Sequence, residues 1–253
     1  MNTLTASAEK PLARRIVILG LVLGAACVLA AVFSGLGYRM DWWHFRTGIQ
    51  IFKWSFYAAI AAVGLSLIGL AISRKSRSVV VMSVLGILIG GIMVYIPFSW
   101  KQTLDAYPYI HDITTDVNDP PQFVAVVALR GPGDHPVTYD GAEVAAQQKQ
   151  AYPDLQPWNS GAGPEEVFAA ATRVIDSMGM EIVASNEGDL HIEATDTTLL
   201  YGFKDDMVVR IVETGDGTRV DVRSKSRVGR SDLGQNAKRV RTFLGRLEEE
   251  LPG

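Results

Sequence analysis

The residues with the clearest chemical potential form a basic stretch, residues 224–236. Alternating apolar and charged residues before it predict a strand. Asp232, with Gln235 three positions later, predicts an N-cap and a capping box that open a helix. Residues 223–246 contain eight Lys or Arg and one acid, whereas the rest of residues 104–253 contains six basic and 24 acidic residues. The sequence therefore predicts an anion-binding loop between a strand and a helix.

Six residues of this stretch are the candidate ligand-binding residues: Ser224, Arg227, Gly229, Arg230, Asp232 and Asn236. The guanidinium groups of Arg227 and Arg230 have the paired donors that suit phosphate or carboxylate. Free backbone N–H groups at the start of the helix would add a fixed anion site, and the amide of Asn236 would orient the ligand. A structural alternative stays open, in which the two arginines pair with Asp232 or with acids from the connecting region and only lock the loop.

A second cluster of possible ligands lies in residues 111–121. Asp116 and Asp119 are weak candidates for holding a cation, because oxygen ligands suit calcium or magnesium. Their spacing matches no metal-binding loop, and Asp or Asn before Pro is common in turns. We therefore expect no metal and no cofactor. A metal-assisted hydrolase that uses Asp116 and Asp119 is the less favoured alternative.

Catalytic and nucleotide-binding motifs are missing from this sequence. It contains no nucleophile elbow, no zinc-ligand spacing, no G-x-G-x-x-G and no P-loop. Cys27 is the one cysteine, so no disulfide can form within the chain. The net charge of residues 104–253 is −11, which disfavours nucleic acid as a partner. The sequence favours a binding module over an enzyme, with a membrane-anchored assembly or stress scaffold as the alternative.

Two unlike parts of the chain must position these residues. Residues 1–103 are apolar and carry a net charge of +8, which indicates a membrane anchor. Within them, three uncharged runs are each long enough to cross a bilayer: residues 16–36, 55–73 and 79–98. Two G-x-x-x-G pairs would let these helices approach closely: Gly20 with Gly24, and Gly86 with Gly90.

Basic residues predict the orientation of this anchor. They lie before the first run and between the second and third: Lys10, Arg14 and Arg15, then Arg74, Lys75 and Arg77. The positive-inside rule places both groups in the cytoplasm, so residues 104–253 would be extracytoplasmic. Five aromatic residues would mark the outer boundary: Trp42, Trp43, Trp54, Tyr95 and Trp100. The first run also suits a signal peptide, but it continues past Cys27, and we expect an uncleaved helix.

Residues 104–253 are expected to form one domain with two parts. Eight of the eleven prolines fall between Pro108 and Pro164, which predicts that residues 104–163 form a loop-rich connecting region packed over the domain, with a short helix near residues 141–151. Residues 164–253 form the core. A helix would begin at Pro164 and stop at Gly179. Four strands would follow, with short links between them (residues 186–189, 204–206 and 214–217), and then a last helix.

This pattern predicts an α+β core of the order α-β-β-β-β-α, with an antiparallel four-stranded sheet and helices on one face. The expected strands are residues 181–185, 190–195, 207–213 and 218–226. One face of the sheet is apolar. The other carries His191, Glu193, Arg210, Asp221 and Arg223, and we expect it to be solvated, with charges paired across strands. A catalytic role for Glu193 or His191 is the less favoured interpretation.

Three stretches resemble one known family: residues 111–123, which end in Asp-Pro-Pro-Gln-Phe, residues 201–206 and residues 224–236. Together with the short membrane bundle they resemble bacterial cell-envelope proteins of the family catalogued as domain of unknown function 1499. The resemblance covers residues 104–251, and its most specific part is residues 227–234. It implies a multi-pass protein of the bacterial inner membrane with a periplasmic domain, and it implies no established activity.

The partners expected from this reasoning are membrane lipids and one anionic ligand. That ligand would be an anionic lipid, an anionic polysaccharide or an acidic protein, bound at the basic loop. The sequence leaves the oligomeric state and the biological process open.

Overall fold

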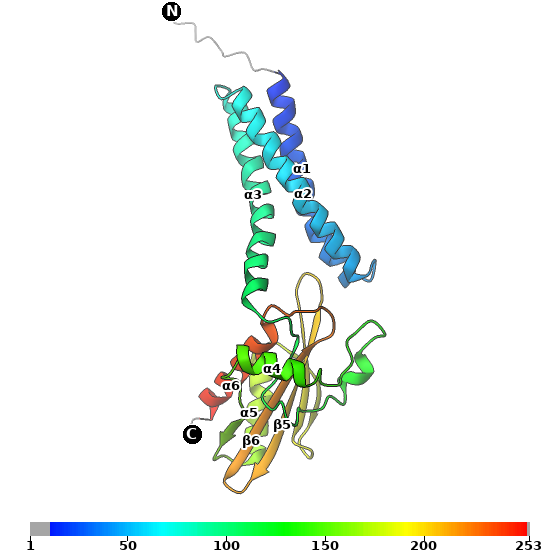
Figure 1. Ribbon diagram of the computed structural model, residues 1–253, viewed down its shortest axis with the longest axis vertical. Helices are drawn as coiled ribbons and strands as arrows, with labels where there is room; N and C mark the ends of the chain where they lie inside the picture. The colour runs from blue at the N-terminus through cyan, green and yellow to red at the C-terminus, as the bar shows by residue number, and fades with distance from the viewer. Residues whose placement is uncertain (1–10, 252–253) are drawn as a thin grey trace, which may run out of the picture. The chain divides into compact units, whose positions relative to one another are not determined.

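A computed structural model of the chain describes residues 11–251, which form two compact units (Figure 1). The first unit comprises the chain up to Gln102 together with Leu199–Gly202. The second comprises Thr103–Thr198 and the chain from Phe203 onward. Lys10 is one of the basic residues from which the orientation of the membrane anchor was predicted, and it lies outside the described residues.

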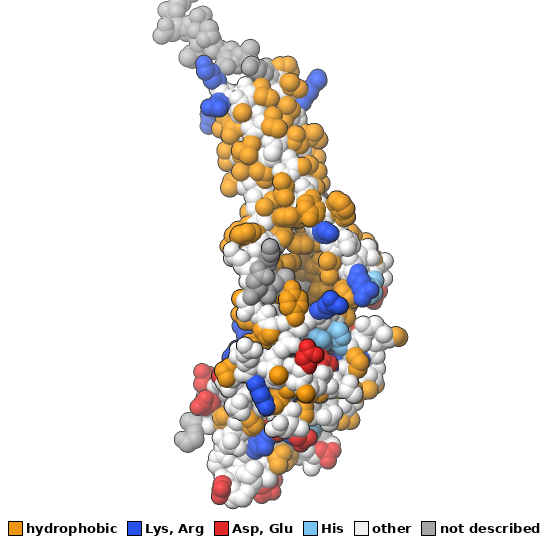
Figure 2. Space-filling model, in the orientation of Figure 1, with side chains coloured by type: hydrophobic (Ala, Val, Ile, Leu, Met, Phe, Trp, Pro, Cys, Tyr) orange, Lys and Arg blue, Asp and Glu red, His pale blue; other side chains and the backbone are white. Residues whose placement is uncertain are grey.

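Three long helices build the first unit: α1 (Pro11–Arg39), α2 (Phe45–Ile72) and α3 (Arg77–Ala106). Each has a stretch that is long and apolar enough to cross a membrane, as predicted, and each helix extends beyond its predicted run. Figure 2 shows hydrophobic side chains over most of this helical surface, with Lys and Arg at the end where the described chain begins. The sequence order of the helices and their apolar character agree with a membrane-associated N-terminal region.

Glycines let the helices of this unit approach one another. A Cβ on Gly20 of α1 would lie 2.8 Å from Ser66 Oγ of α2, and one on Gly90 of α3 would lie 2.7 Å from Val63 Cγ2 of α2. Atoms this close would collide, so both positions require a residue without a side chain. Gly20, Gly86 and Gly90 are therefore packing positions, as glycines of G-x-x-x-G pairs commonly are in membrane helices, whereas a Cβ on Gly24 would meet Ile89 Cγ2 at an ordinary 3.5 Å.

A six-stranded antiparallel sheet forms the middle of the second unit. The strands are β1 (Asp112–Thr114), β2 (Trp158–Ser160), β3 (Glu181–Asn186), β4 (His191–Thr197), β5 (Lys204–Thr214) and β6 (Gly217–Ser226). Their order is β1-β6-β5-β4-β3, and β2 pairs with the same edge of β6 as β1 does.

The prediction of four strands was therefore wrong, because the connecting region adds β1 and β2. Each is only three residues long, too short to show an alternating pattern in the sequence. Both cover the outer edge of β6, whose backbone groups would otherwise lack ladder partners. The link predicted at residues 204–206 was also wrong, since these residues begin β5 and pair with β4.

Helices α5 (Pro164–Ser177) and α6 (Gln235–Glu250) pack on the apolar face of the sheet (Figure 1). The core there includes Val174 and Ile175 of α5, Val240 and Phe243 of α6, and Met207 of β5, all buried. The start of α5 at Pro164 agrees with the prediction. The short helix α4 (Ala142–Ala151) also lies close to its predicted place.

Much of the opposite, polar face of the sheet is buried, which corrects the prediction that this face is solvated, whereas the predicted pairing of charges across strands is confirmed by Arg210 and Asp221. Glu193, Asp221 and Arg223 are at most 1% exposed. Part of the connecting region covers them, including a short 3-10 helix η1 (Val126–Leu129), and Phe123 and Val126 pack there against Val208 of β5. Periodicity along the strands could not reveal this cover, because a loop-rich segment supplies it.

Candidate functional site

The predicted site is the eight-residue loop between β6 and α6, residues 227–234. Gly229, Leu233 and Gly234 have positive φ angles of 98°, 55° and 77°. The helix begins at Gln235 with Gly234 as its N-cap, so the N-cap predicted at Asp232 was wrong by two positions. Leu233 and Gly234 are in left-handed conformations, so the helix begins only after them. The predicted capping box between Asp232 and Gln235 therefore does not form.

Asp232 nevertheless bonds the start of the helix. Its carboxylate oxygens accept the backbone N–H groups of Gly234 and Asn236, each at 2.8 Å. Burial raises the pKa of Asp232, although these two N–H groups act to lower it. The N–H of Asn236, predicted to be open to an anion, is therefore already bound by a carboxyl group of the protein.

Arg227 is locked inside the domain. Its Nη2 lies 2.8 Å from Oδ1 of Asp206 on β5, its Nε lies 3.0 Å from Oδ2, and its Nη1 donates to the carbonyl oxygen of Leu129 at 2.7 Å. The side chain of Arg227 is 6% exposed and that of Asp206 is fully buried. The structural alternative therefore describes Arg227, although its partner is Asp206 and not Asp232.

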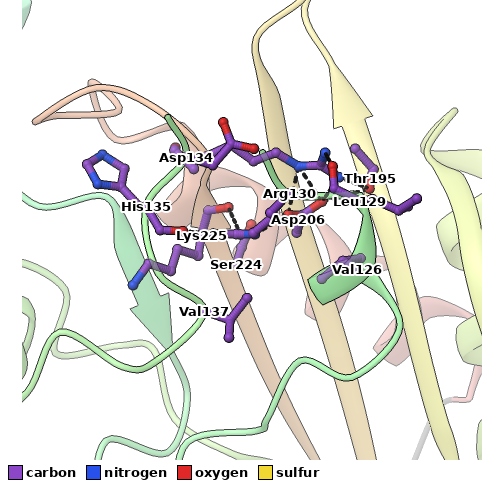
Figure 3. A network of polar contacts seen from close by, with 12 residues as sticks. Val126, Leu129, Arg130, Asp134, His135, Val137, Thr195, Asp206, Ser224 and Lys225 are labelled. Carbon is purple, nitrogen blue, oxygen red and sulfur yellow. Dashed lines mark hydrogen bonds and ion pairs between the residues drawn. The ribbon is translucent and has the colours of Figure 1, made fainter. Parts of the chain in front are cut away.

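Asp206 also holds a second guanidinium group, that of Arg130. Arg130 Nη2 lies 2.8 Å from Oδ2 of Asp206, and the hydroxyl of Thr195 donates to Oδ1 at 2.7 Å. Figure 3 shows these three side chains converging beside Leu129. A carboxylate between two arginines and a hydroxyl group is fully used by the protein itself.

Ser224 and Asn236 belong to a hydrogen-bond network on the helix side of the sheet. Asn236 Oδ1 accepts from Ser224 Oγ at 2.7 Å and from Arg239 Nη1 at 2.6 Å, and its Nδ2 donates to the carbonyl of His111 and to Ser226 Oγ. Asn236 is fully buried. The amide has no remaining hydrogen-bonding capacity with which to orient a ligand.

Arg230 is the exposed cation of the loop. No ion pair or side-chain hydrogen bond joins it to any residue between positions 11 and 251. Lys204, at the start of β5, and Lys238, in the first turn of α6, are also exposed. The backbone N–H of Arg227 donates to the carbonyl of Lys204 at 2.9 Å. Lys204 therefore lies at the same end of the sheet as the loop.

Most of the basic residues of α6 have tertiary partners. Arg239 Nη2 bonds Asp196 at 2.7 Å and Asp205 at 2.8 Å, and Arg241 bonds Asp154. These acids compensate the positive charges near the positive end of the helix dipole. A shallow groove of about 170 Å³ lies beside this helix and is lined by Met178, Met180, Asp196, Gln235, Lys238, Arg239, Thr242 and Arg246.

On the covered polar face, Arg223 and Lys225 bind one carboxylate. Arg223 makes two hydrogen bonds of 2.8 Å to Asp112, and Lys225 Nζ lies 3.1 Å from the same group. All three side chains are fully buried. Arg223 also lies between the rings of Phe123 and Tyr139, at 4.9 and 5.4 Å. Burial and then the nearby Asp112 raise the pKa of Tyr139 to about 12.

Glu193 fixes the covering segment to the sheet. Its carboxylate accepts the backbone N–H groups of Val124, Ala125 and Val126, at 2.6 to 3.0 Å, and lies 2.9 Å from Nε2 of His191. Burial alone would raise the pKa of Glu193, but the hydrogen bonds from His191 and these amides lower it overall. This environment favours the ionised form and suits a structural cap of η1.

The two weak metal candidates face arginines. Asp116 bonds Arg219 at 2.5 Å, and Asp119 bonds Arg210 at 2.8 Å. Burial alone would raise the pKa of Asp116, but backbone N–H groups and Arg219 lower it overall. Guanidinium groups therefore occupy positions next to both carboxylates where a cation would have to bind.

Sequence reasoning missed the acids that complete these pairs, Asp112 and Asp206, and also the pair of His111 with His135. Asp112 is 111 positions from Arg223. No local pattern links residues so far apart. The one signal in the sequence that pointed to such acid partners was the density of charged residues in 111–121.

Comparisons with known proteins give one family. The profile of "Protein of unknown function (DUF1499)" matches residues 112–247, from the start of β1 into α6. A search of curated proteins finds no match. A search of solved structures matches the crystal structure of TTHA0849 from Thermus thermophilus, which is 15% identical, with 38% of this chain and 94% of that chain covered and a TM-score of 0.25.

Proposed function

We propose that this chain, which belongs to the DUF1499 family, is a non-catalytic membrane-anchored module of the bacterial inner membrane whose second unit binds an anionic group through Arg230. The ligand carries phosphate or carboxylate groups, as anionic lipids, envelope polysaccharides and acidic proteins do. Of the six ligand-binding residues predicted from the sequence, we assign the anion contact to Arg230.

The exposure of Arg230 beside a locked neighbour carries this proposal. Arg227 and Asn236, on either side of it, are held by Asp206 and by Ser224 at hydrogen-bond distance. A loop held at both ends presents its exposed guanidinium group with little conformational freedom to lose on binding. Exposed Lys204 adds a second cation at the same end of the sheet.

The states of the acidic residues support binding over catalysis. Asp116 and Asp119 bond arginines, and Glu193 accepts three backbone N–H groups. A general acid or base must be free to exchange a proton with substrate. These carboxylates serve the protein's own structure instead.

An extracytoplasmic location follows from the charges that flank the apolar helices. Arg14 and Arg15 lie in the first turns of α1, and Arg74 and Lys75 lie in the short link between α2 and α3. By the positive-inside rule both sites are cytoplasmic, which puts the end of α3 and the second unit on the other side. In a Gram-negative cell that side is the periplasm.

Binding of polyphosphate to the full-length protein in nanodiscs of zwitterionic lipid tests the proposal. Arg230→Gln should weaken binding by at least about tenfold, because a charge-assisted hydrogen bond contributes about 1.5–3 kcal/mol. Arg173→Gln is the matched control, since Arg173 is an exposed arginine of the same unit with a surface pair to Glu250. Equal losses in both variants would mean that binding is nonspecific, and the proposal would fail.

A further inference from the structure

Two histidines lie against the loop of the candidate site. The imidazole rings of His111 and His135 are stacked, with centroids 4.1 Å apart and an angle of 25° between the planes. His111 comes directly before β1, and His135 belongs to the segment that covers the polar face. The two residues are far apart in the sequence, so only the fold makes them a pair.

Both histidines hold the backbone of the loop. Nε2–H of His135 donates to the carbonyl of Gly229 at 2.8 Å, and its backbone N–H donates to the carbonyl of Arg227 at 2.7 Å. His111 is hydrogen-bonded to the backbone of Arg230, and its carbonyl accepts the N–H of Ser226 at 3.0 Å. The conformation of residues 227–230 therefore depends on these two side chains.

The charged groups around the rings come from three segments. Asp140 Oδ2 lies 3.3 Å from His111 Nε2, and its Oδ1 lies 2.7 Å from Nζ of Lys225 on β6. Arg130 Nη1 donates to the carbonyl of His135 at 2.8 Å. One carboxylate, already bound to Lys225, thus faces the imidazole of His111.

The remaining acids near the pair are used elsewhere. Asp112 binds Arg223 and Lys225, Asp134 accepts the backbone N–H of Gly131, and Asp232 accepts amides at the start of α6. None of these bonds is to an imidazole ring. A positive charge on His111 would therefore be compensated by Asp140 alone among the described acids.

His111 is poorly suited to carry a charge in the folded protein. Its Nε2 is buried and makes no hydrogen bond within residues 11–251, despite the nearby Asp140. Burial, followed by His135, lowers the pKa of His111, and Lys225 lowers it further, whereas Asp140 and the backbone of Arg230 act to raise it. The unfolded chain binds this proton more readily, so the stabilisation is present above about pH 6.5 and is lost as the pH falls through the folded-state pKa.

We propose that His111 and His135 form a proton-sensitive clasp that holds residues 227–232 at neutral pH and releases them in mild acid. Protonation of His111 would place a positive charge in a buried site near Lys225 and against the ring of His135, which separates the two rings and breaks their bonds to Gly229 and Arg230. The inference rests on the proposed function in one respect, that the released loop carries the anion-binding Arg230. Because a held loop loses less conformational freedom on binding, anion binding should then weaken as the pH falls and the loop is released.

Hydrogen exchange of the full-length protein in zwitterionic nanodiscs tests the clasp between about pH 7.5 and 5, the range in which histidine titrates. Corrected for the intrinsic exchange rate, protection of the amides of residues 227–232 should fall roughly tenfold, which corresponds to about 1.4 kcal/mol. Exchange of the imidazole C–H, followed by mass spectrometry, should give His111 a midpoint below about 6.5.

Two variants make the test specific. His111→Gln with His135→Gln removes both imidazole rings but keeps amide donors for the loop carbonyls, and should abolish the pH response. His191→Gln is the matched control, because His191 bonds Glu193 instead of the loop, and it should keep the response. Loop protection that is independent of pH in the natural protein, or equal pH responses in the double variant and the control, would overturn the proposal.

Polyphosphate binding, measured on the same samples, separates this proposal from the proposed function. A loop that opens with acid while no polyphosphate binds at any pH would leave the clasp intact and remove the anion site. Binding that depends on Arg230 but has no clasp-dependent change with pH would leave the anion site intact and remove the clasp.

Discussion

Arg227 and Arg230 are three positions apart, yet their surroundings give them opposite roles. Arg227 reaches inward to a fully buried carboxylate, whereas Arg230 is exposed. A buried ion pair costs desolvation and is stable only when both partners remain. The same side-chain type therefore serves the interior at one position and is available to a ligand at the other.

Replacement of Arg227 by Gln should destabilise the protein strongly. It removes two hydrogen bonds to Asp206 and one to Leu129, and loss of one partner of a buried pair costs about 3–5 kcal/mol. Because Arg130 still neutralises Asp206, we expect about 3 kcal/mol, or a fall of roughly 10 °C in the melting temperature. Differential scanning fluorimetry measures it. Arg230→Gln, an exposed change, should stay within about 0.5 kcal/mol, and similar losses in both variants would contradict the distinction.

At the scale of elements, the connecting region acts as a second layer of the sheet. Within this region, Gln148 of α4 is bonded to β1, because its side chain donates to the carbonyl of Thr114 at 2.6 Å and accepts the N–H of the same residue at 3.0 Å. Glu193 of β4 joins it to η1 through three amides. These polar bonds allow a proline-rich segment without long elements to exclude water from buried charges.

Among the helices of the first unit, Gly90 and Gly91 provide a matched comparison. A Cβ at Gly90 would lie 2.7 Å from Val63 and 3.2 Å from the carbonyl oxygen of Ala59, whereas a Cβ at Gly91 meets no described atom within 4 Å. Gly90→Leu should force α3 away from α2 and lower the melting temperature of the detergent-solubilised protein. Gly91→Leu should leave it nearly unchanged. If both variants unfold at the same temperature, the close approach at Gly90 contributes nothing.

The whole molecule combines an apolar helical unit with a charged sheet unit, and its orientation can be measured directly. An alkaline phosphatase fused after Thr103 should be active in a Gram-negative host, because this enzyme matures only in the periplasm. The same reporter fused after Lys75, in the link between α2 and α3, should be inactive. The reverse pattern would place the second unit in the cytoplasm.

Local sequence patterns determined most of the architecture of this protein. Uncharged runs of bilayer length predicted α1, α2 and α3, and Pro164 followed by an apolar stripe predicted α5. Alternation of apolar residues predicted β3 to β6. These features depend on neighbours within about ten residues, where the helix and strand periods are visible. The family resemblance likewise rested on short stretches of the chain.

The tertiary structure alone decided which charges are free. Arg223, Lys225 and Arg227 look solvated in the sequence, because Arg223 alternates with apolar residues along β6 and the other two lie in the basic stretch that begins at Ser224. Their partners Asp206, Asp112 and Asp140 come from other segments, and the burial of these pairs depends on how the connecting region crosses the sheet. Pairing over such separations leaves no periodic signal, so the division between locked and open cations in the basic loop could be found only in three dimensions.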